Sequence, residues 1–125
     1  MSTFVLADAA AGEAANGRDA LLQAARLKPN LILMDLSMPG TNGTEAISDI
    51  KKRHPEIGIL VLTIHKSEEY IRASLRAGAA GYVLKEDTHI ELLVAIRSVL
   101  NGKTYLSPAI CRNVVTEYLG NPHSN

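Results

Sequence analysis

The chain has 125 residues, of which 46% are hydrophobic and 21% charged, and this length suffices for one domain with its own core. Its 13 basic and 13 acidic side chains cancel, so the chain has no net positive charge of the kind that attracts nucleic acid. The single cysteine, Cys111, excludes an internal disulfide and a cysteine-based zinc site.

Four short segments are rich in apolar residues and are bounded by proline, glycine or charged residues. They are TFVLA at 3–7, LILM at 31–34, IGILVLT at 57–63 and GYVL at 81–84. Segments that are apolar without alternation are typical of parallel strands covered on both faces. We therefore expect four strands at these positions.

Segments with apolar residues at helical spacing lie between and after these strands. They predict helices over 17–28, 44–53, 67–77 and 88–101, each followed closely by proline or glycine, and an appended helix over 107–119. The alternation of strand and helix predicts right-handed crossovers and a parallel α/β sheet. No charged-then-apolar leader or membrane-length apolar run is present, so we expect a cytoplasmic protein without membrane contact.

A polar residue stands at the carboxyl end of each expected strand: Asp8, Asp35, Thr63 and Lys85. Each has an ordinary structural interpretation: Asp35 as a turn former, Asp8 as a helix N-cap, Thr63 as a strand-favouring residue and Lys85 as a solvated flank. In parallel α/β sheets, however, ligands bind outside the carboxyl ends of the strands. The four side chains are thus expected to converge on one edge.

This set of side chains fits phosphoryl transfer. Two neighbouring carboxylates attract a divalent cation, and oxygen ligands suit Mg²⁺. A carboxylate can also attack phosphorus to give an acyl phosphate, whose charge a lysine and a hydroxyl can stabilise. We therefore interpret Asp35 as the nucleophile, Lys85 and Thr63 as phosphate partners, and Asp8 as an acid of the metal site.

Longer motifs point to a family. They are FVLAD at 4–8, GEAANGRDAL at 12–21, LILMDLSMPGTNGTEAI at 31–47, ILVLTIH at 59–65, AGAAGYVLKE at 77–86 and IRSVLNGKTYLSP at 96–108. With these motifs the chain resembles the receiver domain of two-component response regulators, most closely the NarL/FixJ subfamily with LuxR-type output. The resemblance implies a flavodoxin-like (CheY-like) α/β fold, a doubly wound parallel sheet of strand order 2-1-3-4-5.

The resemblance also implies a domain organisation and partners. Residues 1–106 would form the receiver domain, and 107–125 an appended helix and the start of a linker toward an absent C-terminal helix-turn-helix domain that binds DNA. A sensor histidine kinase would donate the phosphoryl group, with Mg²⁺ as cofactor. Modification would switch transcription through a conformational change, with a homodimer expected on activation. Such a chain is a signalling domain and not an enzyme in the usual sense.

Position by position, the resemblance makes Asp35 the phospho-acceptor and gives Thr63 and Lys85 phosphate-sensing roles. Tyr82 occupies the aromatic switch position, where the alternative is a surface aromatic of a strand.

Three further positions belong to the loop after Asp35. Ser37 would offer its backbone carbonyl to Mg²⁺ beside Asp8 and Asp35, and Pro39 and Gly43 would shape the loop.

The chain departs from the family between Asp8 and Gly12. Receivers of this kind have a second acid beside Asp8, where this chain has Ala9, and then a first helix and a second strand. The first helix and most of the second strand are thus missing, about twenty residues. Either this sequence omits a stretch of the natural protein, or a real deletion is compensated, for example by pairing with another chain. If the sequence is literal, Mg²⁺ binding and phosphorylation should be impaired.

Two other functions stay open. The missing acid and helix suit an interaction module, a pseudo-receiver that works without phosphorylation. A small Mg²⁺-dependent phosphohydrolase on the same fold would instead turn over a phosphomonoester many times.

Overall fold

The computed structural model describes residues 3–7, 10–14, 17–35, 43–64, 68–87 and 89–108. Its helices are α1 (Gly17–Leu27), α2 (Gly43–Arg53), α3 (Glu68–Ala77) and α4 (His89–Leu100). All four lie where the apolar spacing of the sequence predicts them, within one residue at either end. The appended helix expected over 107–119 lies almost entirely outside the described residues.

The strands form one sheet. In chain order they are β1 (Thr3–Ala7), β2 (Ala10–Ala14), β3 (Leu31–Asp35), β4 (Gly58–Thr63), β5 (Gly81–Leu84) and β6 (Tyr105–Leu106). Their order across the sheet is β2-β1-β3-β4-β5-β6. The strands expected at 3–7, 31–34, 57–63 and 81–84 are present, whereas β2 and β6 are not among the strands that the sequence patterns predict.

The prediction of a parallel sheet is confirmed for β3, β4 and β5 and wrong for β1. Strands β3, β4, β5 and β6 pair in parallel, but β1 pairs antiparallel with both β2 and β3. A parallel connection needs a dozen or more residues, whereas only two residues separate Ala7 from Ala10. So short a connection permits a hairpin and no crossover helix.

The reversal of β1 changes which edge of the sheet its carboxyl end reaches. Leu6 is the register partner of Leu31, at the start of β3, and Thr3 is the partner of Met34. Ala7 therefore lies at the edge where β3 begins, whereas Asp35 lies at the edge where β3 ends. At about 3.3 Å per residue, the ends of β3 are about 13 Å apart.

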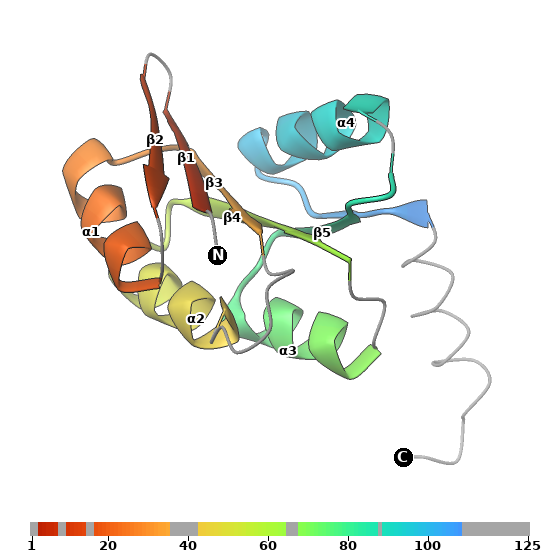
Figure 1. Cartoon of the computed structure of the whole chain (residues 1–125), viewed down its shortest axis with the longest axis horizontal. Coiled ribbons are helices and arrows are strands. Elements are labelled where there is room, and N and C mark those ends of the chain that lie inside the picture. The colour runs from red at the N-terminus through yellow and green to blue at the C-terminus, as the bar shows by residue number, and fades with distance from the viewer. Residues whose placement is uncertain are drawn as a thin grey trace.

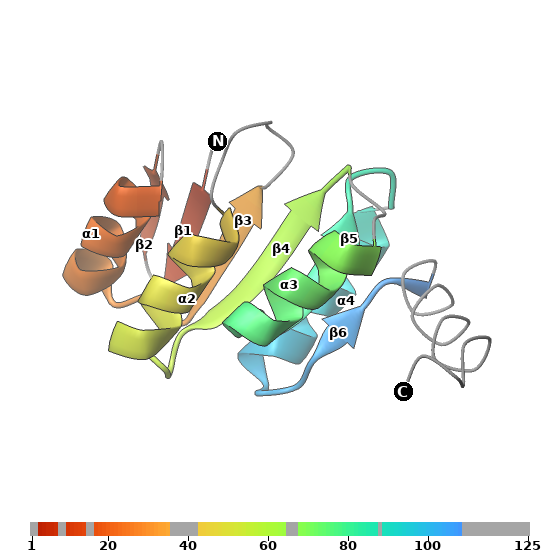
Figure 2. The ribbon, with the colours of Figure 1, turned by 90° about the horizontal axis from the view of Figure 1, so that it is seen from below.

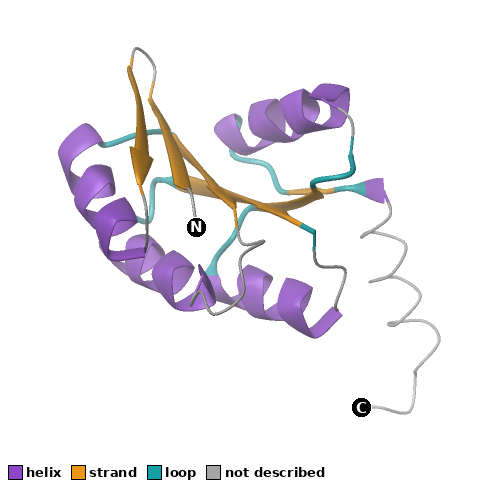
Figure 3. Cartoon of the chain, viewed as in Figure 1, coloured by secondary structure: helices purple, strands orange, loops and turns teal. Residues whose placement is uncertain are grey.

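The helices divide unequally over the two faces of the sheet (Figures 1 and 3). Helices α1, α2 and α3 cover one face, and α4 is the one described helix on the other. Figure 2 shows the face with three helices, with α4 behind the strands. On its face of the sheet, α4 therefore has no other described helix beside it.

The core has two parts, one on each face. The larger part, beneath α1, α2 and α3, includes Ile32, Met34, Ile59, Val61, Ile71 and Tyr82. The smaller part, beneath α4, consists of Leu31, Leu60, Val83, Ala95 and Val99, with Leu33, Leu62 and Ile96 half-buried around it. Alternate residues of β3 and β4 thus serve opposite faces, as the pleat requires. This sandwiching fixes the strand ends that carry the candidate site.

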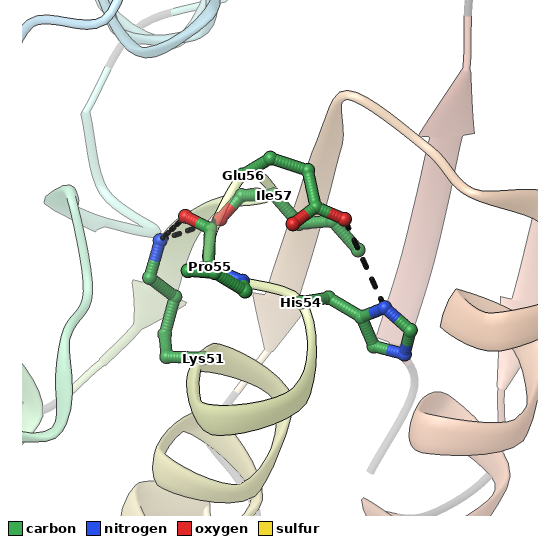
Figure 4. A network of polar contacts seen from close by, with 5 residues as sticks. All are labelled: Lys51, His54, Pro55, Glu56 and Ile57. Carbon is green, nitrogen blue, oxygen red and sulfur yellow. Dashed lines mark hydrogen bonds and ion pairs between the residues drawn. The ribbon is translucent and has the colours of Figure 1, made fainter.

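The connection from α2 to β4 is held by one lysine (Figure 4). The Lys51 ammonium donates hydrogen bonds to the backbone carbonyls of Pro55 at 2.7 Å and Ile57 at 2.9 Å. The imidazole of His54 lies 3.8 Å from the Glu56 carboxylate in the same turn. A Cβ on Gly78, whose φ is 115°, would come within 2.9 Å of the Lys51 side chain. The aliphatic part of Lys51 therefore fits a space that only glycine leaves open.

No helix among the residues described above is long and apolar enough to cross a membrane.

Candidate functional site

The candidate site lies at the edge where the parallel strands β3, β4 and β5 end. Asp35 is the last residue of β3, Thr63 the last of β4, and Lys85 follows the last residue of β5. The strand register pairs Asp35 with Leu62 and Thr63 with Leu84. The backbone N–H of Lys85 also donates to the Thr63 carbonyl at 2.8 Å. Three of the predicted site residues therefore end up side by side.

An ion pair joins two of them. The Lys85 Nζ lies 2.8 Å from the Asp35 Oδ2. Asp35 is the more sheltered partner, with 18% of its side chain exposed against 39% for Lys85. At this distance the contact is a charge-assisted hydrogen bond. Asp35 is thus a partly sheltered carboxylate at a strand end, held against a cation.

Thr63 and Tyr82 form a second pair of site residues, in the interior of the protein. Thr63 and Tyr82 are both fully buried, and their side chains share a hydrogen bond. Burial raises the pKa of Tyr82 to about 12, while the bond with Thr63 lowers it somewhat. Tyr82 is therefore turned into the protein, and not a surface aromatic.

The turn after β5, which carries Lys85, is closed by Asp87, a residue that the sequence reasoning missed. The Asp87 Oδ2 accepts a hydrogen bond from the Leu84 N–H at 2.9 Å, and the Asp87 N–H donates to the Leu84 carbonyl at 3.0 Å. These two bonds close the turn immediately after β5. The signal in the sequence was an aspartate soon after a strand end, a common turn former.

Several predicted site residues lie outside the described residues: Asp8, Ser37 and Pro39, together with Ala9 at the position of the second acid. Gly43 is described; it is buried and begins α2. The roles assigned to Asp8, Ser37, Pro39 and Gly43 stay predictions.

The described residues do not fit a complete Mg²⁺ site. They hold no group of three or more acidic, histidine or cysteine side chains placed to bind a metal. Asp35 is the one described member of the expected ligand set. Strand β1, which leads to the other expected acid, ends at the opposite edge of the sheet, since Leu6 pairs with Leu31. Ala9 has no side-chain ligand to contribute.

Comparison with known proteins gives a consistent result. The sequence profile of the response regulator receiver domain matches residues 3–97. The oxygen regulatory protein NreC of Staphylococcus haemolyticus (strain JCSC1435) is 41% identical over 113 residues, which is 90% of this chain and 52% of that protein. The chain spans about half the length of the curated relatives it matches.

Solved structures show the same likeness. A two-component response regulator of the LuxR family from Aurantimonas sp. SI85-9A1 superposes with a TM-score of 0.79 and 31% identity, covering 84% of this chain and 75% of that one. The isolated receiver domain of RcsB from Salmonella enterica serovar Typhimurium was solved in the presence of the phosphomimetic BeF₃⁻. It superposes with a TM-score of 0.68 and 27% identity, covering 78% of this chain and 72% of that one.

Proposed function

The chain belongs to the response regulator receiver domain family, and we propose from this that Asp35 accepts a phosphoryl group from a sensor histidine kinase. The observation that carries the proposal is the 2.8 Å contact between Lys85 Nζ and Asp35 Oδ2 at the carboxyl edge of the sheet. In the reaction, an Asp35 oxygen attacks the phosphorus of a phosphohistidine. The P–N bond breaks, a P–O bond forms, and the leaving imidazole nitrogen takes up a proton.

The residues around Asp35 have distinct tasks in this proposal. Lys85 already holds the carboxylate, and after transfer its ammonium neutralises a phosphoryl oxygen. The Thr63 hydroxyl, which now shares a hydrogen bond with Tyr82, lies on the strand next to that of Asp35 and can donate to the phosphoryl group instead. Loss of the Thr63 bond would change the environment of a fully buried aromatic ring. This links the modified edge to the interior of the protein.

In this proposal, the activity that the receiver regulates resides in another domain of a longer protein. The LuxR-family relatives extend beyond the matched region, and we infer a C-terminal DNA-binding domain for the natural protein of which this receiver is the regulatory part. Phosphorylation then shifts an existing equilibrium that sets dimerisation and transcription.

Mg²⁺ is the cofactor that receivers generally use, where it supplies charge stabilisation to the transferring group. Asp35 is the one residue of the expected ligand set that the structure describes. We therefore propose a weakened metal site, with Lys85 carrying most of the charge stabilisation.

One observation favours a second candidate function. Ala9 stands where the family has a second acid. The described strand before it, β1, ends at the edge of the sheet opposite to Asp35. This favours an interaction module of receiver fold that works without phosphorylation.

One experiment separates the two candidates. The protein is incubated with acetyl phosphate, with and without Mg²⁺, and analysed by intact and peptide mass spectrometry. A phospho-acceptor gains the mass of one phosphoryl group on Asp35, and the variant Asp35→Asn does not. An unmodified protein that circular dichroism shows to be folded would reject phospho-acceptance and support the interaction module.

A further inference from the structure

Lys85 is the cation of the proposed site, yet the sheet fixes only part of its conformation. Its N–H donates to the Thr63 carbonyl at 2.8 Å, but the register of β4 and β5 ends one residue earlier, at Leu84. A lysine side chain is flexible along its four-carbon stem. The position of the Lys85 ammonium therefore depends on what holds the turn after β5.

The contact between Lys85 and Asp35 also reaches across a strand. Asp35 ends β3 and Lys85 follows β5, with β4 between them. Neighbouring strands lie about 4.8 Å apart, so two such intervals separate the two backbones by roughly 10 Å. A contact of 2.8 Å then requires the Lys85 backbone to direct its side chain along the edge of the sheet toward β3. In a reaction, misplacing such a group by about 1 Å can lower the rate about 100-fold.

Asp87 fixes this direction by holding both backbone groups of Leu84. Its Oδ2 accepts a hydrogen bond from the Leu84 N–H at 2.9 Å, and its N–H donates to the Leu84 carbonyl at 3.0 Å. Lys85 and Glu86 are the two central residues of the turn that these bonds close. The backbone of Lys85 is thus held on one side by Thr63 and on the other by Asp87.

The Asp87 carboxylate occupies the place that a strand residue would have opposite Leu84. Backbone groups of successive strand residues point to opposite sides, so those of Leu84 point away from β4, toward which the Lys85 N–H points. On that side β6 ends at Leu106, opposite Tyr82 and two residues short of Leu84. Leu84 is buried. Without the Asp87 side chain its N–H loses its acceptor, which is costly in the interior.

Asp87 is itself held from α4. Glu91, in the first turn of α4, shares a side-chain hydrogen bond with Asp87. Desolvation raises the pKa of Glu91, and the neighbouring Asp87 carboxyl raises it further. Because α4 packs on the sheet through the smaller part of the core, this bond ties the turn to the body of the protein.

We propose that Asp87 is a positioning residue of the phospho-acceptor site: by closing the turn of residues 84–87, it holds Lys85 where its ammonium contacts Asp35. The proposal rests on the function proposed for Asp35 and adds a residue that acts through Lys85.

The first test is the rate at which acetyl phosphate phosphorylates Asp35. Asp87→Ala should slow this rate about tenfold, because Lys85 is no longer held in place. Asp87→Asn keeps a side-chain oxygen for the Leu84 N–H and should stay within about threefold of the original rate. Asp49→Ala removes an exposed aspartate of α2 and should leave the rate unchanged.

A double variant shows whether Asp87 acts through Lys85. Once Lys85→Ala has removed the side chain that is positioned, adding Asp87→Ala should change the rate by less than about twofold. A loss by the same factor with and without Lys85 would mean a merely structural role and overturns the proposal. So does an Asp87→Ala variant as fast as Asp49→Ala, or an Asp87→Asn variant as slow as Asp87→Ala.

A measurement without phosphorylation separates this proposal from the function proposed for Asp35. In ¹H–¹⁵N spectra of lysine ammonium groups, the Lys85 signal is identified by its absence from Lys85→Ala. It should be resolved in the original protein and in Asp87→Asn, and lost to solvent exchange in Asp87→Ala. This pattern in a protein that acetyl phosphate does not modify would reject phospho-acceptance and keep the positioning of Lys85. A signal that persists in Asp87→Ala overturns the positioning.

Circular dichroism establishes that each variant is folded. Should Asp87→Ala not fold, Glu91→Ala replaces it in the same comparisons, since it removes only the bond from α4. Its rate should fall about threefold, and an unchanged rate overturns the proposal.

Discussion

At the scale of single residues, the contact between Lys85 and Asp35 has the clearest consequence. We expect Lys85→Ala to slow the phosphorylation of Asp35 by acetyl phosphate about 10- to 100-fold, because the transferring phosphoryl group loses its nearest cation. The rate is measured by the growth of the phosphorylated mass with time. Lys103→Ala removes an exposed lysine elsewhere and serves as the matched control. Equal rates for the two variants would contradict the role given to Lys85.

The buried Tyr82 hydroxyl predicts a dependence of stability on alkaline pH. An unfolded tyrosine ionises near pH 10, whereas Tyr82 in the folded protein keeps its proton until about pH 12. The folded state therefore binds more protons between these values, and the free energy of unfolding falls as pH rises through this window. The stabilisation is fully present below pH 10, and its loss amounts to about 3 kcal/mol at most.

Urea unfolding at a series of pH values measures this effect, with Tyr82→Phe as the comparison. The variant lacks the titrating hydroxyl, so its stability should fall less steeply across the same window. Tyr70 and Tyr105 also have pKa values raised by burial and contribute in the same direction in both proteins. Identical slopes for the two proteins would show that Tyr82 titrates normally.

At the scale of elements, Lys51 ties the end of α2 to the start of β4. We expect Lys51→Met, which keeps the aliphatic chain and removes the ammonium, to lower the free energy of unfolding by about 1–2 kcal/mol. Two backbone carbonyls, of Pro55 and Ile57, lose their donor. Lys52→Met changes the adjacent, exposed lysine and should alter stability far less. Thermal or urea unfolding compares them, and equal losses would refute the bridging role of Lys51.

The helices were predictable because each repeats apolar residues at helical spacing and ends at proline or glycine. The parallel strands were predictable because they are apolar on both faces. Strand β2, with sequence AAGEA, carries no such signal, and its pairing comes from the hairpin that joins it to β1. Strand β6 has only two residues, too few for a pattern.

The candidate site was predictable where it depends on strand ends. Asp35, Thr63 and Lys85 each stand at the carboxyl end of an apolar strand, and parallel pairing brings such ends together. The direction of β1 was not predictable from its composition, because an apolar strand reads alike in both directions. Direction depends on the length of the connection that follows it.

At the scale of the whole molecule, the reversal of β1 separates the two ends of the expected metal site. We expect Ala9→Asp, which restores the acid that the family has at this position, to leave phosphorylation of Asp35 and its dependence on Mg²⁺ essentially unchanged. The preceding strand ends at Ala7, on the edge away from Asp35. Isothermal titration with Mg²⁺ and the mass-spectrometric rate measure this. A tenfold gain in affinity would show that β1 runs parallel to β3.

An intact mass measurement accompanies this experiment. A mass of 13.4 kDa would show that β1 and β2 are joined by two residues, and a mass larger by about a helix and a strand would show an additional segment.

The sheet order also has a consequence for how the chain folds. From β3 onward, each strand pairs with the strand that follows it along the chain, through crossovers that each enclose a helix packed on the sheet. The β1–β2 hairpin closes a much shorter loop, but a two-stranded hairpin is marginally stable on its own and depends on docking against β3. The segment from β2 to β3 instead passes over β1, which lies between them. We therefore expect the amides of β4 and β5 to gain protection first in pulsed hydrogen exchange during refolding, and those of β1 and β2 last. In this chain the order of folding would run from the carboxyl-terminal half toward the amino terminus.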